Sequence, residues 1–248
     1  MLLLLPPSET KRDGGMPGSA LDLAVLRLPE LTRQRKAAIA ALRRLSRTKG
    51  AAMAALKLGP TQAAEVRRNR ELLVSPVMPA LDRFDGVLYD ALDAPSLSPQ
   101  ARAFAGEHVL IASALFGLVG ALDPVPAYRL SPDSRLPELP LKAHWAAAVR
   151  AALASRAGGE LVLDLRSEAY AALGPAPEGA WFVRVVAEDG AGRRRALNHF
   201  NKQGKGELVR RMLDAGRDHA DLDALLGWAA EAGIRLEPGA AGELDLVV

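Results

Sequence analysis

The sequence predicts a mixed α/β (α+β) fold. A single domain over residues 1–248 is expected to hold a sheet flanked by helices, with a basic helical lobe at residues 29–73. Short apolar runs of strand length alternate along the chain with segments of helical periodicity. The hydrophobic fraction of 49% is typical of a globular protein of 248 residues. Neither an internal repeat nor a shift in composition marks a boundary between domains.

The first third of the chain begins with a predicted strand and continues into helices. The apolar run Leu2–Leu5 stops at two prolines and lacks a basic flank, so it indicates a buried strand rather than a signal peptide. A helix is predicted over Pro29–Ser46 because leucines and alanines recur there at helical spacing. Shorter helices are predicted at 51–58 and 61–73.

The remaining elements alternate between helices and strands. Two apolar runs, at 109–113 and 161–165, predict buried strands, whereas residues 124–140 contain too many prolines for regular structure. The segment Asp189–Gly192 predicts a hairpin between strands at 180–188 and 193–200. Further helices are predicted at 99–107, 143–154, 201–215 and 222–232, and closing strands at 234–237 and 243–248.

Charge is segregated along the chain, although its net value is only +3. Residues 27–70 carry twelve Lys or Arg against two acids, and residues 184–217 carry nine against four. Residues 221–248 reverse the balance, with six acids and one Arg. Such segregation favours a surface that attracts polyanions. The alternative is a solvated helix face without a partner.

Nine cations of the lobe are candidates for contact with DNA phosphates. On the helix predicted at 29–46, five of them occupy an arc opposite the apolar face. The segment 56–64 (LKLGPTQAA) has the outline of a helix–hairpin–helix, in which a glycine turn opens a helix N-terminus that can take a phosphate. The nine candidates are Arg33, Lys36, Arg43, Arg44, Arg47, Lys57, Arg67, Arg68 and Arg70.

A second candidate site combines polar residues that follow predicted strands with two lysines of the helix at 201–215. Lys202 and Lys205 lie on the apolar side of that helix, which indicates that its end opens into a cleft. The alternative is that both lysines extend into solvent. Asp123 and Glu168 are their candidate partners, since residues after strand ends gather at ligand sites. The other cleft candidates are Ser8, Glu9, Lys11, Ser113, Tyr128, Arg129, Ser167, Tyr170 and Asn201.

Several classes of protein are disfavoured. The chain has no cysteine, which excludes disulfides and thiolate chemistry. It has no dinucleotide-binding or Walker loop and no zinc-protease or serine-hydrolase motif, and its four histidines lack metal-ligand spacing. Only His199, beside the lysines, is of interest, and a structural role is favoured for it. No cofactor and no metal are expected. The lack of an apolar run of membrane-spanning length predicts a cytoplasmic protein without membrane contact.

The polar segments together resemble the YaaA peroxide-stress family, in the order that the family shows them. The resemblance covers nearly the whole chain, and the joint match is specific although no single block is. Ala114 stands where the family usually has glycine. The matching blocks are LLPPSETK at 4–11, RFDGVLY at 83–89, SALFGL at 113–118 with Asp123 and YRL at 128–130, LRSEAY at 165–170, and NKQGKG at 201–206.

This resemblance implies protection against hydrogen peroxide, including lower free intracellular iron. It also implies an unusual α/β fold with a positively charged cleft and a helix–hairpin–helix that binds DNA. The sequence therefore predicts a DNA-binding protein of the peroxide stress response that contacts the phosphate backbone of a duplex or junction. The alternative is an enzyme acting on a nucleotide-like or phosphorylated small molecule. On that alternative Lys202 is a nucleophile or base, and Glu168 orients it.

Overall fold

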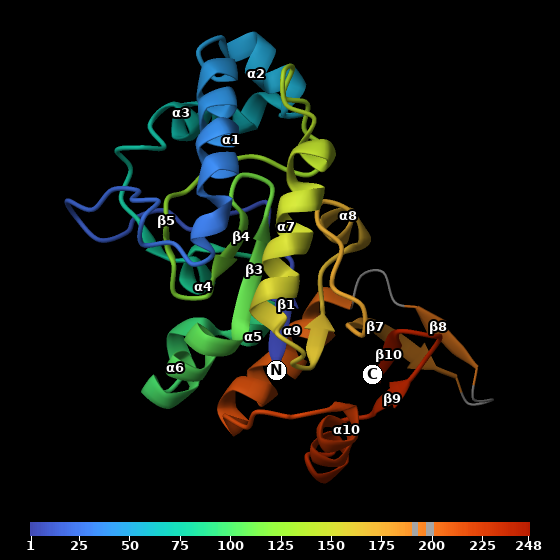
Figure 1. The fold of residues 1–248 in the computed structure, drawn as a ribbon. Helices are drawn as coiled ribbons and strands as arrows, with labels where there is room; N and C mark the ends of the chain where they lie inside the picture. Colours follow the sequence, from blue (N-terminus) through green and yellow to red (C-terminus); the bar gives the residue numbers. More distant parts are fainter. Residues whose placement is uncertain (190–192, 197–200) are drawn as a thin grey trace.

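The computed structural model describes residues 1–189, 193–196 and 201–248, and an eight-stranded mixed sheet forms the centre of these residues (Figure 1). The strands lie in the order β4-β3-β1-β6-β7-β10-β9, and β8 pairs with β7. Their bounds along the chain are β1 Leu2–Leu5, β3 Val109–Ser113, β4 Gly117–Gly120, β6 Val162–Asp164, β7 Trp181–Glu188, β8 Arg194–Ala196, β9 Leu236–Pro238 and β10 Glu243–Val247.

The middle of the sheet is parallel. Strand β1 pairs in parallel with β3 and β6, and β7 pairs in parallel with β6 and β10. The pairs β3–β4, β7–β8 and β9–β10 are antiparallel. Side chains of Leu2–Leu5 are all 0% exposed, because a parallel strand at the centre of a sheet is covered on both faces. This burial accounts for the continuous apolar run at the start of the sequence.

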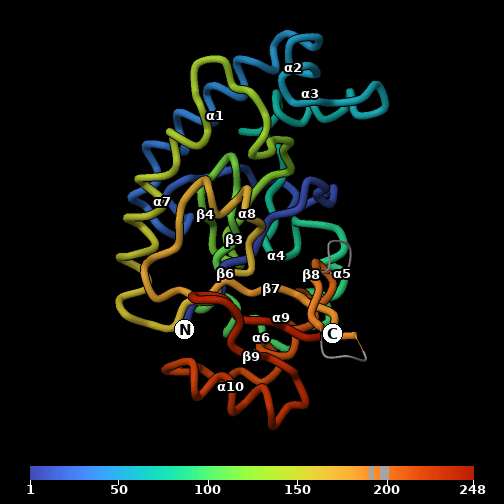
Figure 2. Tube along the Cα trace, turned by 90° about the vertical axis from the view of Figure 1, so that its right-hand side faces the viewer, coloured from blue at the N-terminus to red at the C-terminus, as the bar shows by residue number. Residues whose placement is uncertain are grey.

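Helices cover both faces of the sheet. Helices α1 (Thr32–Leu45) and α7 (Leu141–Ala157) lie on one side of it, and α5 (Val87–Leu92), α6 (Pro99–His108) and α9 (Asn201–Ala215) lie on the other (Figures 1 and 2). The other elements are α2 Lys49–Ala55, α3 Ala64–Arg70, α4 Ala80–Arg83, α8 Glu168–Ala171, α10 Leu222–Glu231, three 3-10 turns at Pro29–Leu31, Pro60–Gln62 and Ala94–Ser96, and a separate two-stranded sheet of β2 Met78–Pro79 and β5 Pro124–Val125.

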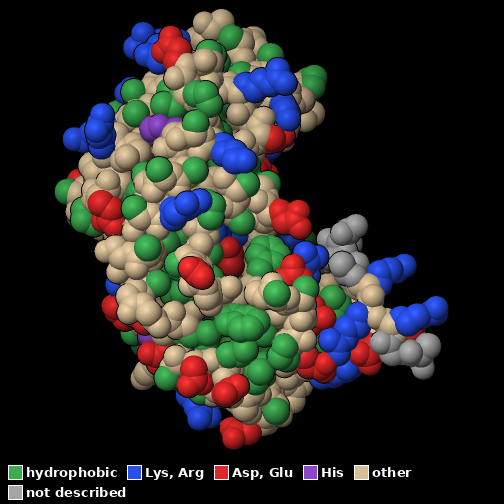
Figure 3. All heavy atoms as spheres, turned by 45° about the vertical axis from the view of Figure 1, so that its right-hand side comes forward, with side chains coloured by type: hydrophobic (Ala, Val, Ile, Leu, Met, Phe, Trp, Pro, Cys, Tyr) green, Lys and Arg blue, Asp and Glu red, His purple; other side chains and the backbone are tan. Residues whose placement is uncertain are grey.

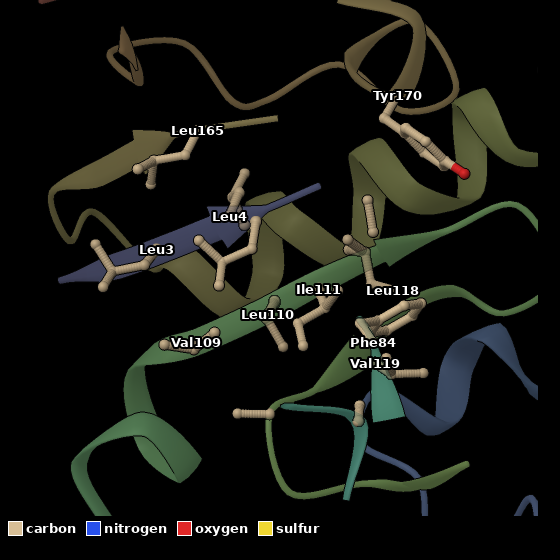
Figure 4. Packing of buried hydrophobic residues seen from close by; sticks show 14 of the residues in the cluster. Leu3, Leu4, Phe84, Val109, Leu110, Ile111, Leu118, Val119, Leu165 and Tyr170 are labelled. Carbon is tan, nitrogen blue, oxygen red and sulfur yellow. The ribbon is translucent and has the colours of Figure 1, made fainter. Parts of the chain in front are cut away.

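One continuous hydrophobic core joins these elements. It extends from Met1 to Leu246, and Figure 4 shows residues of β1 and β3 packed within it. Trp145 of α7 is fully buried, and its indole N–H donates to the Ala114 carbonyl at 2.9 Å. Gly117 has φ +74°, and a Cβ there would lie 2.7 Å from the Trp145 ring. The turn between β3 and β4 therefore requires glycine for both reasons.

The predicted mixed α/β fold class is confirmed, and most of the predicted elements are found within a few residues of their expected bounds. The helix expected at 61–73 is shorter, since a 3-10 turn precedes α3 and the helix ends at Arg70. The proline-rich segment 124–140 begins with the two-residue strand β5. Sequence reasoning missed α4, α5, α8, β2 and β4. Parts of the expected hairpin, at 190–192 and 197–200, lie outside the described residues.

Helices α1, α2 and α3 form the expected basic lobe, with α2 and α3 beyond one edge of the sheet (Figure 2). The Asn69 side chain fixes α3 to the loop at Arg129, donating to its carbonyl at 2.9 Å and accepting from its N–H at 2.8 Å. Between α2 and α3, the Gln62 side chain accepts from Gly59 N–H at 3.0 Å. That this connection binds DNA as a helix–hairpin–helix stays a prediction.

Two arginines are fully buried structural residues. Arg35 of α1 donates to the carbonyls of Phe116, Leu118 and Arg27 at 3.2, 2.8 and 2.7 Å. Arg83 similarly donates to the carbonyls of Val125, Gly14, Pro76 and Arg12. Each guanidinium thereby satisfies backbone carbonyls from several separate segments of the chain.

None of the helices within the described ranges combines the length and the hydropathy needed to cross a bilayer.

Candidate functional site

A pocket of about 420 Å³ lies where β1 and β6 end, beside the first turn of α9. Both strands are parallel, so the residues that follow them reach the same edge of the sheet. Figure 3 shows the surface hollowed on this side of the molecule, between the lobe and the C-terminal part of the chain. The pocket is lined by Pro6, Pro7, Glu9, Leu88, Pro132, Asp133, Leu165, Ser167, Ala169, Tyr170, Asn201, Lys202 and Lys205.

Lys205 forms a buried cationic part of this lining. Its side chain is 4% exposed, and Nζ donates to the Leu165 carbonyl at 3.0 Å and lies 5.0 Å from the centre of the Phe182 ring. Burial lowers the pKa of Lys205 to about 8, although the nearby Asp164 carboxylate opposes that shift. Asp164 is itself held by Arg166 at 2.7 Å. The ammonium is thus positioned by carbonyls and not by a direct ion pair.

Lys202 and Asn201 lie one turn earlier on α9. Lys202 is exposed, lines the pocket, and like Lys205 has no carboxylate partner among the described residues. Gly206 allows this helix to pack closely, since a Cβ there would lie 2.3 Å from the Leu88 carbonyl of α5. The same contact places Leu88 in the pocket wall. The pocket lining therefore contains two lysines without a carboxylate partner among the described residues, one exposed and one buried.

The opposite side of the pocket contains a carboxylate with unused hydrogen-bonding capacity. Glu9 Oε2 lies 3.3 Å from a terminal nitrogen of Arg129, which is ion-pair range. That geometry does not make a hydrogen bond, and both Glu9 Oε2 and Arg129 Nε are buried without a hydrogen-bond partner in the described structure. The two charges therefore attract each other, and the two atoms keep unused capacity to accept and to donate.

Lys11 is buried beneath this carboxylate. Its Nζ donates to the Ser8 and Glu9 carbonyls at 2.9 and 3.3 Å and lies 4.2 Å from the centre of the Tyr128 ring. Burial lowers the pKa of Lys11 from 10.5 to about 7, and the Glu9 carboxylate opposes this shift only in part. Lys11 is accordingly a group that changes charge near neutral pH.

All three tyrosines of the chain gather around Lys11 and Glu9. The Tyr128 hydroxyl lies 2.7 Å from Ser113 Oγ, and the Tyr89 hydroxyl donates to the Pro6 carbonyl at 2.7 Å. Burial raises the pKa of Tyr170 well above its usual value, and Glu9 raises it further. The tyrosines are therefore neutral at physiological pH, and Tyr170 presents its ring to the pocket.

The titration of Lys11 predicts a pH dependence of stability. A lysine whose folded pKa is depressed binds fewer protons in the folded state than in the unfolded one, so stability rises with pH between about 7 and 10.5. From pH 7 to pH 9 we expect Lys11 to contribute a gain of about 2 kcal/mol in the free energy of unfolding. Denaturant titrations at both pH values should show that Lys11→Met loses this gain. Lys36→Met, at an exposed lysine, should keep it, and an unchanged pH response in Lys11→Met would contradict the prediction.

The three residues expected to be catalytic are not brought together. Lys202 lines the pocket, but Asp123 does not, because its carboxylate accepts from the backbone N–H groups of Gly120 and Arg27 at 2.8 and 2.9 Å. Burial raises the pKa of Asp123 there. Glu168 is exposed and lies outside the lining, within electrostatic range of Arg184. The expected pairing of these acids with Lys202 is not found in the described structure.

Most of the other cleft candidates do lie together. Glu9, Ser167, Tyr170, Asn201, Lys202 and Lys205 line the pocket. Lys11, Tyr128 and Ser113 lie in the buried layer beneath Glu9, and Ser8 supplies a carbonyl to Lys11. Sequence reasoning missed Leu88, Pro132 and Asp133 in the lining. The SPDS run at 131–134 was a signal for a turn, but nothing in it indicated proximity to Glu9. His199 lies outside the described residues.

The cations of the lobe divide into paired and unpaired groups. Lys57 forms an ion pair with Asp133 at 2.6 Å, and Arg44 pairs with Glu138. Arg68 pairs with Asp13 and Glu65, and Arg70 donates to the Ser46 and Arg47 carbonyls. Of the nine candidates, five are exposed and have neither an acidic nor a carbonyl partner among the described residues: Arg33, Lys36, Arg43, Arg47 and Arg67.

The stripe of four cations, meaning Arg33, Lys36 and Arg43 of α1 and Arg47 in the turn just beyond its end, is separate from the pocket. No α1 residue is among those that line it. The lobe instead reaches the pocket through the Lys57–Asp133 ion pair, since Asp133 is part of the lining. In Figure 3 basic side chains are spread over the lobe, and acidic ones lie at the hollow. The stripe and the pocket are therefore described as two separate candidate sites.

Within the described ranges, no group of three or more histidine or acidic side chains is placed to hold a metal ion. The fold and the site together define a mixed α/β protein with a lysine-bearing pocket at the ends of parallel strands and a basic helical lobe beside it.

The chain belongs to the family described as peroxide stress protein YaaA, whose model matches residues 1–233. It is 41% identical to a UPF0246 protein of Corynebacterium glutamicum, with full coverage of both chains. It is 42% identical to a UPF0246 protein of Corynebacterium efficiens, also over both full lengths. A UPF0246 protein of Streptomyces coelicolor is 40% identical over this whole chain and 98% of its own length. Membership of this family supports a role in peroxide stress.

Proposed function

We propose that this protein acts in the peroxide stress response by binding the phosphate backbone of DNA through the stripe on α1. The observation that carries the proposal is the exposure of the four stripe cations without acidic partners in the described structure. A cation already held by a carboxylate must lose that partner before it can bind a phosphate. The stripe needs no such exchange, so the release of DNA counterions drives its binding directly.

The dimensions of the stripe match a duplex. Residues 33–45 of α1 span roughly 18 Å at 1.5 Å per residue, and Arg47 lies beyond the end of the helix. Duplex DNA carries a negative charge about every 1.7 Å along its axis, so several phosphates lie within reach of the four side chains. The described lobe offers no aromatic platform for stacked bases, and aromatic residues make up 4% of the chain. Binding through this surface is therefore expected to be nonspecific or selective for DNA structure.

The helix that carries the stripe is firmly positioned. Arg35 holds α1 to the β4 segment from the opposite face, and His144 of α7 lies 3.0 Å from the Gln34 carbonyl. A fixed helix presents its cations in one arrangement, which lowers the entropy that they lose on binding. The lobe is thus suited to recognise the shape of a charged surface.

Replacement of the stripe should weaken DNA binding strongly. The variant Arg33→Gln, Lys36→Gln, Arg43→Gln, Arg47→Gln is expected to lose roughly 100-fold in affinity at low salt. The slope of log K against log salt should fall by about 3 to 4, because each phosphate contact contributes about 0.9. Fluorescence anisotropy with a labelled duplex and a labelled four-way junction, at several salt concentrations, measures both quantities.

A matched variant controls for the loss of net charge. It removes four exposed cations from the C-terminal third of the chain instead: Arg195→Gln, Arg211→Gln, Arg217→Gln and Arg235→Gln. This control should retain most of the affinity and most of the slope. Equal losses in the two variants, or no detectable binding of the natural protein to either DNA at low salt, would overturn the proposal.

The pocket supports a second candidate function, the binding and conversion of an anionic small molecule. The observation that favours it is the pair of lysines without acidic partners beside the orphaned Glu9 carboxylate. A surface that contacts only DNA phosphates does not require an enclosed pocket with buried tyrosines. Lys205, whose pKa burial lowers to about 8, is the group best suited to exchange a proton there, in place of the pair of Lys202 and Glu168 expected from the sequence.

A further inference from the structure

The residues that line the pocket form two chemically different sets, which define its two ends by the groups they supply. In one set Lys202, Lys205 and Asn201 of α9 supply ammonium and amide donors, and Ser167 adds a hydroxyl that makes no bond to the helix it precedes. In the other set Glu9 and Asp133 supply carboxylate acceptors. A ligand that satisfies both ends must carry an anionic group and, some distance away, hydroxyl or N–H donors.

The wall between the two ends is apolar. It is formed by the rings of Pro6, Pro7, Pro132 and Tyr170 and by the side chains of Leu88 and Leu165. Prolines and an aromatic ring make flat surfaces against which a planar group packs well. The volume of about 420 Å³ lies at the low end of the range for small-molecule sites, roughly 300–1,000 Å³.

The charges indicate how many phosphates the pocket accepts. Glu9 is compensated by Arg129 and Asp133 by Lys57, which leaves Lys202 and Lys205 as the uncompensated charges. Two ammonium groups match one phosphomonoester, which carries close to two negative charges at neutral pH. A triphosphate usually needs a divalent cation, and the described residues contain no cluster of acids placed to hold one.

We infer that this pocket binds a nucleoside 5′-monophosphate unit, with the phosphate on Lys202 and Lys205 and the ribose hydroxyls or base N–H groups on Glu9. Glu9 lines the pocket and supplies the carboxylate that such a ligand would meet. Carboxylates accept from ribose hydroxyls in other nucleotide sites. The inference adds a ligand class to the second candidate function and does not require that the stripe bind DNA.

The same chemistry has two sources, a free nucleotide and the 5′-phosphorylated end of a DNA strand. Both present one terminal phosphate on a ribose or deoxyribose that bears a planar base. A free nucleotide fills the pocket alone. A strand end would also place its following phosphates outside the pocket. The experiment below separates the two.

Calorimetric titration of the full chain at pH 7 tests the inference with AMP, adenosine and inorganic phosphate. AMP should bind at least tenfold more tightly than adenosine, and at least tenfold more tightly than inorganic phosphate, because only AMP engages both ends of the pocket. Equal affinity for AMP and adenosine would overturn the assignment of the lysines. Equal affinity for AMP and inorganic phosphate would overturn the assignment of the apolar wall and Glu9.

Variants locate the binding. Lys202→Gln changes an exposed side chain, so folding is preserved, and the affinity for AMP should fall at least tenfold. Lys205→Met should act in the same way, with the melting temperature recorded because Lys205 is buried. Lys142→Gln, at an exposed lysine of α7, is the control and should leave the affinity unchanged. Unchanged AMP binding in Lys202→Gln, or an equal loss in Lys142→Gln, would refute the site.

Competition with short single-stranded oligonucleotides separates the two sources. Displacement of AMP by a 5′-phosphorylated strand, but not by the same strand with a 5′-hydroxyl, supports the inference and identifies strand ends as ligands. Displacement by neither strand, together with AMP binding, supports the free nucleotide. The stripe variant should bind AMP normally, and Lys202→Gln should bind duplex DNA normally, so failure of one proposal is distinguishable from failure of the other.

Discussion

Replacing Gly206 by alanine is expected to destabilise the protein by about 2–4 kcal/mol, although the substitution adds a single methyl group. The new Cβ would lie 2.3 Å from the Leu88 carbonyl oxygen and 2.9 Å from the Ala91 side chain. The oxygen belongs to backbone, so it cannot move aside as the end of a flexible side chain could. Helix α9 must then separate from α5, which also moves Lys205 and Leu88 apart at the pocket.

Gly227 in α10 provides the matched control. It lies within a helix, is exposed, and a Cβ there would have no neighbour within 4 Å. Gly227→Ala should therefore stabilise the protein by up to about 1 kcal/mol, because alanine favours the helix and restricts the unfolded chain. Urea unfolding of both variants measures the two effects. Similar stability of Gly206→Ala and the natural protein would show that the contact between α5 and α9 is looser than the structure has it.

Replacing Arg35 by leucine is expected to cost about 3 kcal/mol or more. The side chain is fully buried, and its removal leaves the carbonyls of Phe116, Leu118 and Arg27 without their donor. The Asp123 carboxylate, whose charge acts on Arg35, would lose a compensating cation in a buried setting. Burial lowers the pKa of Arg35 only to about 10, so the guanidinium remains charged at neutral pH.

Two further variants show whether geometry or charge is responsible. Arg35→Lys keeps the charge but lacks the planar fork of donors, so it should recover only part of the stability. Arg33→Leu, two residues away on the exposed face of α1, should change stability by less than about 0.5 kcal/mol. Thermal and urea unfolding measure these differences. If Arg35→Leu and Arg33→Leu were equally mild, Arg35 would not be the anchor of α1.

Gly206 and Arg35, with the helices that carry them, show what the sequence could predict of the fold and what it could not. Periodicity predicted α1 and α9 with nearly correct bounds, because leucines on one face of each helix are buried. Periodicity places Arg35 on the face of Ala38 and Leu42, but it cannot show what satisfies a guanidinium there, since the carbonyls that hold it belong to residues 27, 116 and 118. Helix α5 was missed because six residues are too few for a helical pattern to emerge.

The candidate site was also predicted only in part, because some of its contacts join segments that are far apart in the sequence. Residues that follow β1 and β6 could be placed at one edge of the sheet, which brought Glu9, Ser167 and Tyr170 together with the lysines of α9. Asp123 follows β4, an antiparallel strand that runs the other way, so the same rule placed it at the wrong end. The pairing of Lys57 with Asp133 depends on how the lobe folds back, which no local pattern records.

The Lys57–Asp133 ion pair links the free energy of binding at the pocket to the free energy of binding at the lobe. Asp133 belongs to the pocket lining, while Lys57 belongs to the lobe. An occupant that draws the carboxylate away would leave an additional positive charge on the lobe and so strengthen its attraction for a polyanion. Thermodynamic reciprocity then requires that the bound polyanion increase the affinity of the pocket for that occupant by the same factor. Binding at the pocket would therefore change the affinity of the lobe, and binding at the lobe would change the affinity of the pocket, without any rearrangement of the sheet.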